Sequence, residues 1–222
     1  MNWHLLRKCA WIDTRAQFVS QTPAGGRLLD IGASDGETLN HFAELRPDLD
    51  FCATDIAGSP ENYPVGTEFH RGDLEKETLP WPANFFDAVT CMHVVEHLRD
   101  HALLFSEVSR VLKPEGRIYF ETPHPKTLKL PSAKGKFTLN FFDDPTHIEI
   151  VTVERLAELS SASGLRVVRR GVSRNLLFAG AYPFYFFRAP SRQRFTALTH
   201  WLGWSAFLIA QKPDEQFVRN KI

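Results

Sequence analysis

Short apolar runs alternate along this chain with segments in which apolar side chains recur at helical spacing. Glycine, proline or charged residues bound each run, as is typical of buried strands, and the first five runs end near residues 31, 55, 71, 91 and 121. Helical patterns separate the runs, notably at 102–112, where the pattern stops at Lys113-Pro114. This alternation predicts an α/β fold, a doubly wound sheet with its ligand site at the carboxyl ends of parallel strands.

The second half of the chain continues the alternation. Residues 153–163 are predicted as a helix closed by Gly164, followed by a sixth strand at 165–172. The apolar run at 204–210 is predicted as the last strand.

The chain is predicted to form a single domain of residues 1–222, with three segments added to the α/β sheet. Residues 123–150 are too long for an ordinary connection, so we expect a lid-like loop that closes over a substrate. Residues 175–200 form an aromatic insertion, and residues 1–25 an N-terminal helical cap. An amphipathic helix covering the ligand cleft and ordinary core packing both explain the apolar side chains of this cap: Trp3, Leu6, Trp11 and Phe18.

The stretch Leu28–Glu37 is the most informative part of the chain. It reads as a buried strand, a glycine turn and the start of a helix, where free backbone N–H groups meet a ligand. The turn carries acids at Asp30, Asp35 and Glu37, and its spacing departs from the dinucleotide pattern G-x-G-x-x-G. These acids disfavour a pyrophosphate, and with it a nicotinamide-dependent oxidoreductase. They favour a cationic ligand without phosphate, namely S-adenosylmethionine.

Acidic residues also end the next two predicted strands. Asp55 lies where a doubly wound sheet places the carboxylate that accepts hydrogen bonds from a ribose diol. Asp73, in Gly72-Asp73-Leu74, follows the third strand, where an acid can accept from an adenine amino group.

Together these motifs resemble the class I S-adenosylmethionine-dependent methyltransferases over residues 26–212. The order and spacing of the motifs carry the resemblance: Asp30–Gly36, Asp55, Gly72–Leu74, Leu79-Pro80, Phe86-Asp87, Val94–Leu98 and Leu112–Gly116. Ser34 replaces a glycine that is common in relatives, which is tolerable unless the backbone there needs a positive φ.

The resemblance implies a Rossmann-like methyltransferase fold. It implies a seven-stranded, mostly parallel sheet in the order 3-2-1-4-5-7-6, with the last strand antiparallel. It also implies that S-adenosylmethionine is the cofactor, and the residues expected to bind it are Asp30, Gly32, Ser34, Asp35, Gly36, Asp55, Ile56, Asp73, Leu74 and His93.

Charge is unevenly distributed along a chain of zero net charge. Residues 164–222 carry ten Lys/Arg against two Asp/Glu, a net charge of +8, and they include the aromatic insertion. A substrate lid or a packed helix pair explains this segment best, and peripheral contact with a membrane or a lipid-linked substrate is an alternative. Nucleic acid is a less favoured partner, because the protein is neutral overall and has no recognised RNA-binding module.

Cysteine usage and the N-terminus predict a cytoplasmic protein, peripheral to a membrane if the insertion touches one. Cys9, Cys52 and Cys91 are odd in number and lack metal or redox spacing, so they read as reduced structural thiols. The first residues contain no long apolar run, so neither a signal peptide nor a membrane-spanning helix is expected.

Methyl transfer from a sulfonium requires little more than alignment of the acceptor and removal of its proton. Four histidines follow the fourth and fifth strands and are the candidate catalytic groups: His93, His97, His124 and His147. In Cys91–His97 the spacing predicts one helical face shared by His93, Glu96 and His97. His41, His70 and His101 are expected to be surface or core residues.

A metal site is the alternative interpretation of these histidines. Ubiquinone O-methyltransferases and small-RNA 3′-end methyltransferases bind a divalent metal through Glu-x-x-Glu-His here, and this chain departs from that motif with His93 in the first glutamate's place. A set of His93, Glu96, His97 and His147 suits manganese, iron or zinc better than magnesium. We favour the alternative without metal, in which Glu96 and His97 serve capping and packing.

The expected reaction is methylation of an acceptor hydroxyl on a small molecule, a sugar or a lipid-linked glycan. The histidines supply deprotonation, and the aromatic insertion suits an apolar or ring-shaped acceptor. Two alternatives stay open: a metal-assisted enzyme acting on a diol or an RNA 3′ end, and a catalytically idle, cofactor-binding partner subunit. The sequence leaves the oligomeric state open.

Overall fold

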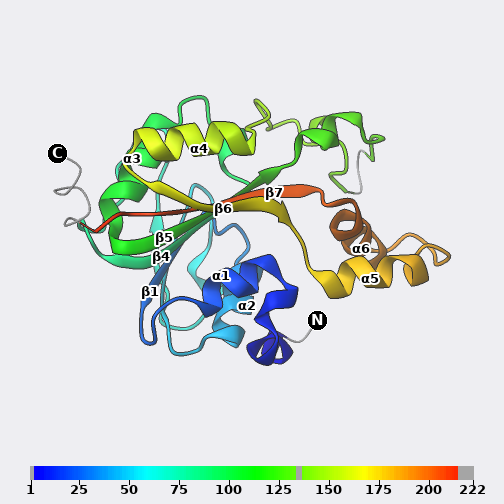
Figure 1. The fold of residues 1–222 in the computed structure, drawn as a ribbon, viewed down its shortest axis with the longest axis horizontal. Coiled ribbons are helices and arrows are strands. Elements are labelled where there is room, and N and C mark those ends of the chain that lie inside the picture. Colours follow the sequence, from blue (N-terminus) through cyan, green and yellow to red (C-terminus); the bar gives the residue numbers. More distant parts are fainter. Residues whose placement is uncertain (1–2, 134–136, 215–222) are drawn as a thin grey trace.

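Seven strands form one sheet in the order β3-β2-β1-β4-β5-β7-β6 in the computed structural model, which describes residues 3–133 and 137–214 (Figure 1). Neighbours among β1 to β5 run parallel, and β7 lies antiparallel to both β5 and β6. This confirms the predicted fold class and strand order. The strands are β1 Arg27–Ile31, β2 Asp50–Asp55, β3 Glu68–Arg71, β4 Phe86–Met92, β5 Leu112–Pro123, β6 Arg166–Ser173 and β7 Ser205–Gln211.

Helices cover both faces of the sheet, and two further helices lie beyond its end. In Figure 1, α3 and α4 lie on one face and α1 and α2 on the other, while α5 and α6 project from the end of β6 and β7. The helices are α1 Thr14–Ser20, α2 Glu37–Leu45, α3 Ala102–Val111, α4 Val153–Ala162, α5 Leu176–Tyr185 and α6 Arg192–Leu202.

The period of two along β1 divides the core into two clusters. Leu29 and Ile31 join one cluster with Phe105 of α3, whereas Leu28 joins the other with Phe42 of α2. All five side chains are almost fully buried. Because both faces of β1 are covered, its residues from Leu28 to Ile31 are all buried, including the carboxylate of Asp30.

Side-chain caps explain where several helices begin. The Asp13 carboxylate accepts a hydrogen bond from the Ala16 backbone N–H at the start of α1, and Thr152 and Ser191 cap α4 and α6 in the same way. The Asn175 side chain caps α5 and also donates to Asp13 at 2.8 Å. The insertion after β6 is therefore joined to the N-terminal segment by a buried polar pair.

Residues 3–20 are mostly helical but do not form one continuous helix. This segment forms two 3₁₀ helices, Trp3–Lys8 and Ala10–Ile12, before α1 begins at its Asp13 cap. Leu6 and Phe18 pack into the core on the α2 side of the sheet, as the packing alternative held, but Trp11 is 66% exposed. The side chain of Trp3 lies outside the described part of the structure.

The loop of residues 123–150 and the insertion of residues 175–200 meet beside the carboxyl ends of the parallel strands. The loop contains two short 3₁₀ helices, Pro125–Lys129 and Phe141–Asp143, and its residues 134–136 lie outside the described residues. Phe137 of the loop stacks on Phe195 of α6 with ring centroids 4.3 Å apart. Over residues 3–133 and 137–214, no helix is both long and apolar enough to cross a bilayer.

Gly32 should be intolerant of any side chain, and Gly66 provides a matched comparison. Both have positive φ, +76° and +88°, but a Cβ on Gly32 would lie 2.2 Å from Val94 Cγ2, whereas a Cβ on Gly66 would meet open space. We expect Gly66→Ala to lower the free energy of unfolding by about 1–2 kcal/mol through backbone conformation alone. Gly32→Ala should cost about 1–3 kcal/mol more because of the overlap. Urea denaturation of both variants measures the difference, and equal losses would contradict this packing.

Candidate active site

A pocket of about 450 Å³ lies at the carboxyl ends of β1 to β4. The turns after these strands supply most of its lining, and residues 94–98 after β4 close one side. The residues around it are Gly32, Ser34, Asp55, Ile56, Gly72, Asp73, Leu74, Glu75, His93, Val94, His97, Leu98 and Thr146. This is the edge at which a doubly wound sheet binds its ligand, and we refer to this hollow as the cofactor pocket.

The turn after β1 is held in a left-handed backbone conformation at three positions. Gly32, Ser34 and Gly36 have φ values of +76°, +48° and +77°. Ser34 therefore occupies the conformation that disfavours a side chain, so its replacement of glycine carries a backbone cost. The Asp55 carboxylate offsets this cost because it accepts hydrogen bonds from the backbone N–H groups of Ser34 and Ala57, both at 2.8 Å.

Most of the residues predicted to bind the cofactor surround this pocket, but three lie beside it. Asp30 is buried beneath the turn, where it accepts a hydrogen bond from Thr90 Oγ1 at 2.6 Å. Burial raises the pKa of Asp30 to about 7. Asp35 accepts a hydrogen bond from the Glu37 backbone N–H, and Gly36 is the N-cap residue of α2. Asp30, Asp35 and Gly36 therefore shape the turn rather than line the pocket.

A second pocket, of about 410 Å³, adjoins the first and shares His93 and His97 with it. We call it the acceptor pocket. Its walls come from α1, the ends of β4 to β7, the loop of residues 123–150 and α6. The residues around it are Arg15, His93, His97, Glu121, Phe137, Thr138, Asp144, His147, Ser173, Phe195, Thr199, His200, Trp204 and Ser205.

His93 lies between two buried carboxylates at the junction of the pockets. Its Nδ1 is 3.1 Å from Glu96 Oε1 and its Nε2 is 3.3 Å from Glu121 Oε1. Burial by itself would lower the pKa of His93, but hydrogen bonds and charge from Glu121 and Glu96 raise it to about 9. His93 is therefore an imidazolium at neutral pH, and both ring nitrogens donate.

Arg15 and Tyr119 complete the surroundings of Glu121. The Arg15 guanidinium binds both oxygens of the Glu121 carboxylate, at 2.6 and 2.9 Å, and the Tyr119 hydroxyl donates to it at 2.7 Å. Burial would raise the pKa of Glu121, but the charges of Arg15 and His93 hold it well below its usual range. Such a bidentate pair is the strongest geometry available to a buried carboxylate.

The predicted helical face of His93, Glu96 and His97 is wrong. His93 has a φ of +56° and precedes the 3₁₀ helix Val95–His97, so the chain reverses between His93 and Glu96. His93 reaches Glu96 through this reversal rather than along a helix.

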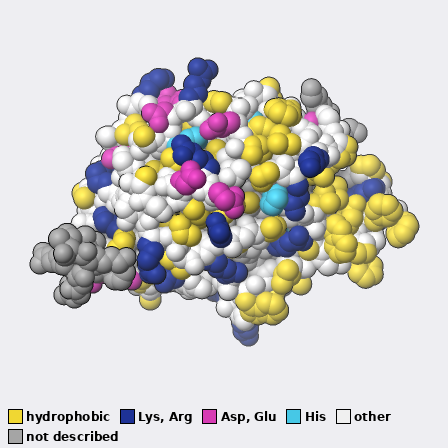
Figure 2. Space-filling view, turned by 45° about the horizontal axis from the view of Figure 1, so that its top comes forward, with side chains coloured by type: hydrophobic (Ala, Val, Ile, Leu, Met, Phe, Trp, Pro, Cys, Tyr) yellow, Lys and Arg dark blue, Asp and Glu magenta, His cyan; other side chains and the backbone are white. Residues whose placement is uncertain are grey.

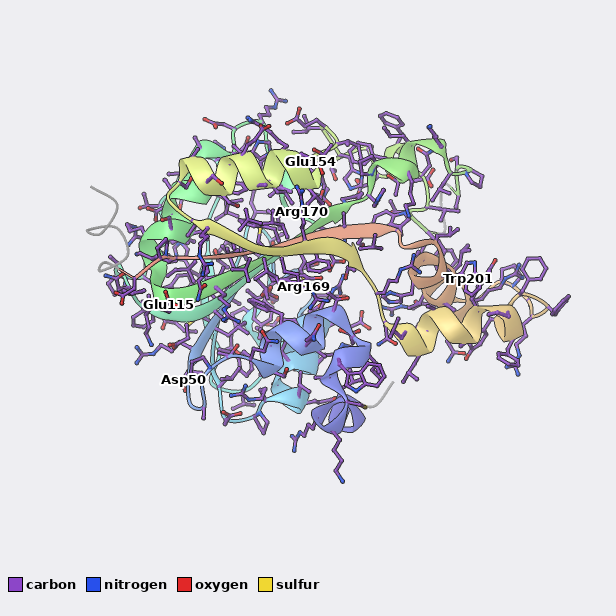
Figure 3. All side chains as sticks on the ribbon, viewed as in Figure 1. Asp50, Glu115, Glu154, Arg169, Arg170 and Trp201 are labelled. Carbon is purple, nitrogen blue, oxygen red and sulfur yellow. The ribbon has the colours of Figure 1, made fainter. Side chains whose placement is uncertain are left out.

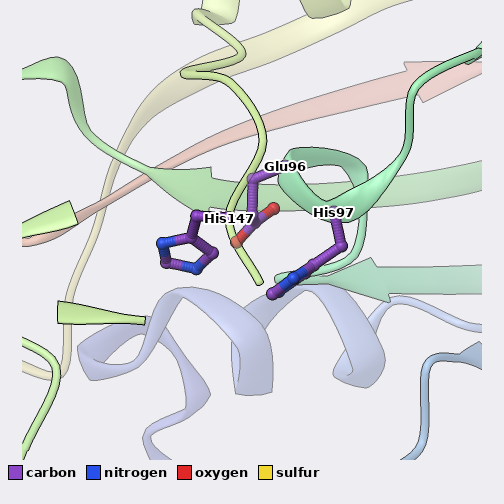
Figure 4. Close-up of side chains that lie close together, drawn as sticks. All are labelled: Glu96, His97 and His147. Atoms are coloured by element: carbon purple, nitrogen blue, oxygen red, sulfur yellow. The ribbon is translucent and has the colours of Figure 1, made fainter. Parts of the chain in front are cut away.

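Three of the four residues of the predicted metal set do come together. One potential ligand atom each from Glu96, His97 and His147 lies within 4.8 Å of the others (Figure 4). His147 Nδ1 is 2.6 Å from the Phe141 carbonyl, and His97 Nδ1 is 2.9 Å from Thr146 Oγ1. The Phe141 carbonyl can only accept, so the His147 ring proton lies on Nδ1, and His147 Nε2 lies 3.9 Å from Asp144 Oδ2. The Thr146 hydroxyl donates to Asp144, so His97 Nδ1 donates to Thr146, and His97 Nε2 has no hydrogen bond within the described residues. His93 stands apart from this group because both of its nitrogens are committed to carboxylates.

Glu96 Oε2 is the unusual atom of this group. The Glu96 side chain is fully buried, and among the described residues Oε2 has no hydrogen-bond partner, whereas Oε1 contacts His93. A buried carboxylate oxygen is costly without a partner, so this atom points to a ligand or a proton at the site.

His124 is separated from the other predicted catalytic histidines. It caps the 3₁₀ helix Pro125–Lys129 and faces a different hollow, beside Glu154 and Arg170. The structure thus brings together His93, His97 and His147 but not His124. His41 is half-buried, His101 is buried and His70 is partly exposed, as expected for surface and core residues.

Sequence reasoning missed Arg15, Glu121, His200 and Trp204. Glu121 could have been identified from the sequence, since it is an acid near the carboxyl end of a parallel strand, where the ligand is expected to bind. Arg15 and His200 had none, because they reach the pocket from α1 and α6, which only the tertiary fold brings there. Burial lowers the pKa of His200 to about 4, so this ring is neutral, and its Nδ1 accepts from the Asn175 backbone N–H.

The sequence is similar to that of known methyltransferases. A family model described as a methyltransferase domain matches residues 3–170. The chain is 28% identical over 215 residues to a ubiquinone biosynthesis O-methyltransferase of Ralstonia nicotianae, a match covering 92% of this chain and 82% of the relative. The enzyme of that name from Pseudomonas syringae pv. tomato is 27% identical, over 71% of this chain and 69% of the relative.

Solved structures share the fold at lower sequence identity. An S-adenosylmethionine-dependent methyltransferase from Mesorhizobium loti gives a TM-score of 0.64 at 18% identity, over 92% of this chain and 97% of that one. A methyltransferase-like chain solved with the Haloferax volcanii Trm112 activator also gives 0.64, at 16% identity and over 96% and 94% of the two chains.

The raised pKa of His93 predicts a pH-dependent contribution to stability. Because the folded pKa, about 9, exceeds the ordinary value of 6.5, protonated His93 stabilises the fold fully below pH 6.5 and loses this effect as pH rises through 9. We compare wild type with His93→Asn, since asparagine tolerates the positive φ. Their difference in unfolding free energy should shrink by about 1.4 kcal/mol per pH unit between these limits. Urea denaturation measures this difference, and one that stays constant or grows would contradict the network.

Proposed function

This chain belongs to the class I S-adenosylmethionine-dependent methyltransferases, and we propose that it methylates a hydroxyl of a small molecule or glycan held in the acceptor pocket. One observation carries the proposal: the cofactor and acceptor pockets meet at His93 and His97. A sulfonium methyl group at that shared wall faces the second pocket. In-line displacement needs only such an alignment of donor and acceptor.

We assign the cofactor's parts to the pocket by chemistry. The Asp55 carboxylate, at the end of β2, would accept hydrogen bonds from the ribose diol, and Asp73 would accept from the adenine amino group. Ile56 and Leu74 would provide apolar contacts for the adenine ring. Ile56 is 67% exposed without a ligand, which supports this role, since an adenine would cover it.

His97 is the best candidate for the base that removes the acceptor's proton. It borders both pockets, and its Nε2 is free because Nδ1 is engaged by Thr146. His93 is unsuited to this task, since a pKa near 9 leaves it protonated at neutral pH. Because both of its N–H groups are engaged by Glu96 and Glu121, His93 would position these carboxylates at the shared wall rather than donate to the acceptor.

Metal-assisted transfer is a second candidate, favoured by the unpartnered Glu96 Oε2 beside His97 and His147. One carboxylate and two histidines form a donor set that suits manganese, iron or zinc. The contacts of His97 Nδ1 with Thr146 and of His147 Nδ1 with the Phe141 carbonyl fix both rings, as hydrogen bonds to metal-binding histidines do. A metal bound there would lower the pKa of an acceptor hydroxyl.

Asp55 should contribute to cofactor affinity in a way that Asp50, at the other end of β2, does not. Asp50 lies at the far end of the molecule from α5 and α6 (Figure 3). We expect Asp55→Asn to weaken S-adenosylhomocysteine binding by roughly tenfold or more, because hydrogen bonds to a charged acceptor are strong. Asp50→Asn should leave the affinity unchanged. Isothermal titration calorimetry measures both, and an unchanged affinity in Asp55→Asn would remove the ribose assignment.

Transfer of a labelled methyl group from S-adenosylmethionine to a panel of phenols, catechols and sugars tests the reaction itself. We expect wild type to methylate a hydroxyl acceptor and His97→Gln to lose roughly a hundredfold or more in kcat. His70→Gln, a histidine outside both pockets, is the control. Tight cofactor binding with no transfer to any acceptor would instead favour an idle partner subunit.

Metal analysis separates the two mechanisms. Protein purified without a histidine tag either contains stoichiometric manganese, iron or zinc that is lost in His147→Asn, or contains none. Activity that survives a chelator, in metal-free protein, assigns deprotonation to His97 alone. Activity that needs added metal assigns it to the Glu96, His97 and His147 group.

A further inference from the structure

The hairpin of α5 and α6 presents an unusually apolar surface. Six large hydrophobic side chains of this hairpin are exposed, and we call them the hairpin surface: Leu176, Leu177, Phe184, Phe186, Phe187 and Trp201. Phe184 and Phe187 protrude furthest, with 78% and 90% of their surface exposed. In Figure 2, hydrophobic side chains gather over this end of the molecule. An apolar patch of this kind marks an interaction site in a folded protein.

Helix α5 is apolar on every side yet is not covered by the protein. Its sequence, Leu176–Tyr185, contains no charged residue, and Ala179 is its one buried residue. A helix that is apolar all round belongs in a protein core or in lipid. Packing against α6 covers only part of α5, so the remainder needs another apolar environment.

Arginines border this surface, and acids are absent from its sequence. Residues 174–204 contain four arginines and no aspartate or glutamate. The guanidinium of Arg188 lies 5.5 Å from the Tyr185 ring centroid, and that of Arg194 lies 5.7 Å from the Phe186 ring centroid. The labelled acids Asp50 and Glu115 lie at the opposite end of the molecule from Trp201 (Figure 3). Protruding aromatics with arginines among them match a bilayer interface that carries anionic headgroups.

We propose that the hairpin surface docks this protein onto an anionic lipid bilayer. Phe184 and Phe187 enter the interfacial region, while Arg188 and Arg194 contact lipid phosphates. The stems of these arginines cover aromatic rings, which lets the charged ends reach the headgroups. The docked face adjoins the catalytic region, because Phe195, Thr199 and His200 on α6 line the acceptor pocket.

Co-sedimentation with lipid vesicles tests this proposal without any assay of methyl transfer, so its outcome is independent of the proposed reaction. Wild-type protein should bind vesicles of equal parts phosphatidylcholine and phosphatidylglycerol, and bind pure phosphatidylcholine more weakly. Phe184→Ser with Phe187→Ser should weaken binding by roughly tenfold or more. The matched control changes two exposed apolar residues elsewhere, Trp11→Ser with Val65→Ser, and should bind like wild type.

A second pair of variants tests the arginines. Arg188→Gln with Arg194→Gln should weaken binding to the mixed vesicles but not to pure phosphatidylcholine. Arg155→Gln with Arg170→Gln removes the same charge from α4 and β6 and should have no effect. Circular dichroism and thermal unfolding verify that each variant folds.

Three results would overturn the proposal. The first is wild-type protein that fails to sediment with the mixed vesicles. The second is a dimer in analytical ultracentrifugation that the phenylalanine pair dissolves, since this would assign the hairpin surface to a second copy of the chain. The third is tighter binding to an RNA oligonucleotide than to vesicles, removed by the same substitutions.

Discussion

A buried chain of alternating charges organises the candidate active site. It runs from Arg15 to Glu121, His93 and Glu96, and so joins α1, the end of β5 and the turn after β4. Glu121 is paired with both Arg15 and His93, whereas Glu96 contacts His93 through Oε1 alone, so loss of His93 would leave Glu96 buried without a charged partner. The network therefore joins the left-handed backbone at His93 to α1 through Glu121.

The network also divides the chemical roles between the two pockets. It holds the His93 ring at their shared wall. Outside the network, His97 Nε2 has no hydrogen bond within the described residues, and His147 Nε2 lies 3.9 Å from Asp144 Oδ2. Under the proposed function, the cofactor would lie at the carboxyl ends of the parallel strands. The acceptor pocket is lined in part by the loop of residues 123–150 and by α6, which lie outside the sheet.

The alternation of strands and helices, the turn after β1 and the acids that follow it could be predicted because their signals are local in the sequence. The strand order is implied only by the resemblance to the methyltransferase family. The relation between His93 and Glu96 could not, because spacing alone suggested a helix where the chain in fact reverses at a positive φ. Arg15 and His200 reach the pocket from segments distant in the sequence. His124 follows a strand at the right edge but faces another hollow, since cap formation turns its side chain away.

Strands β6 and β7 are antiparallel neighbours, a connection that a tight turn of a few residues could complete. Instead the chain passes through α5 and α6 before it returns to the sheet. The register of β6 and β7 shifts once, between Val167 and Arg169, and is unbroken from Arg169 to the last pair, Ser173 and Ser205. Such an insertion can change in length or sequence without altering any backbone hydrogen bond between β6 and β7. Changes in this insertion would therefore alter the acceptor pocket, which α6 helps to line, and leave the cofactor pocket unchanged.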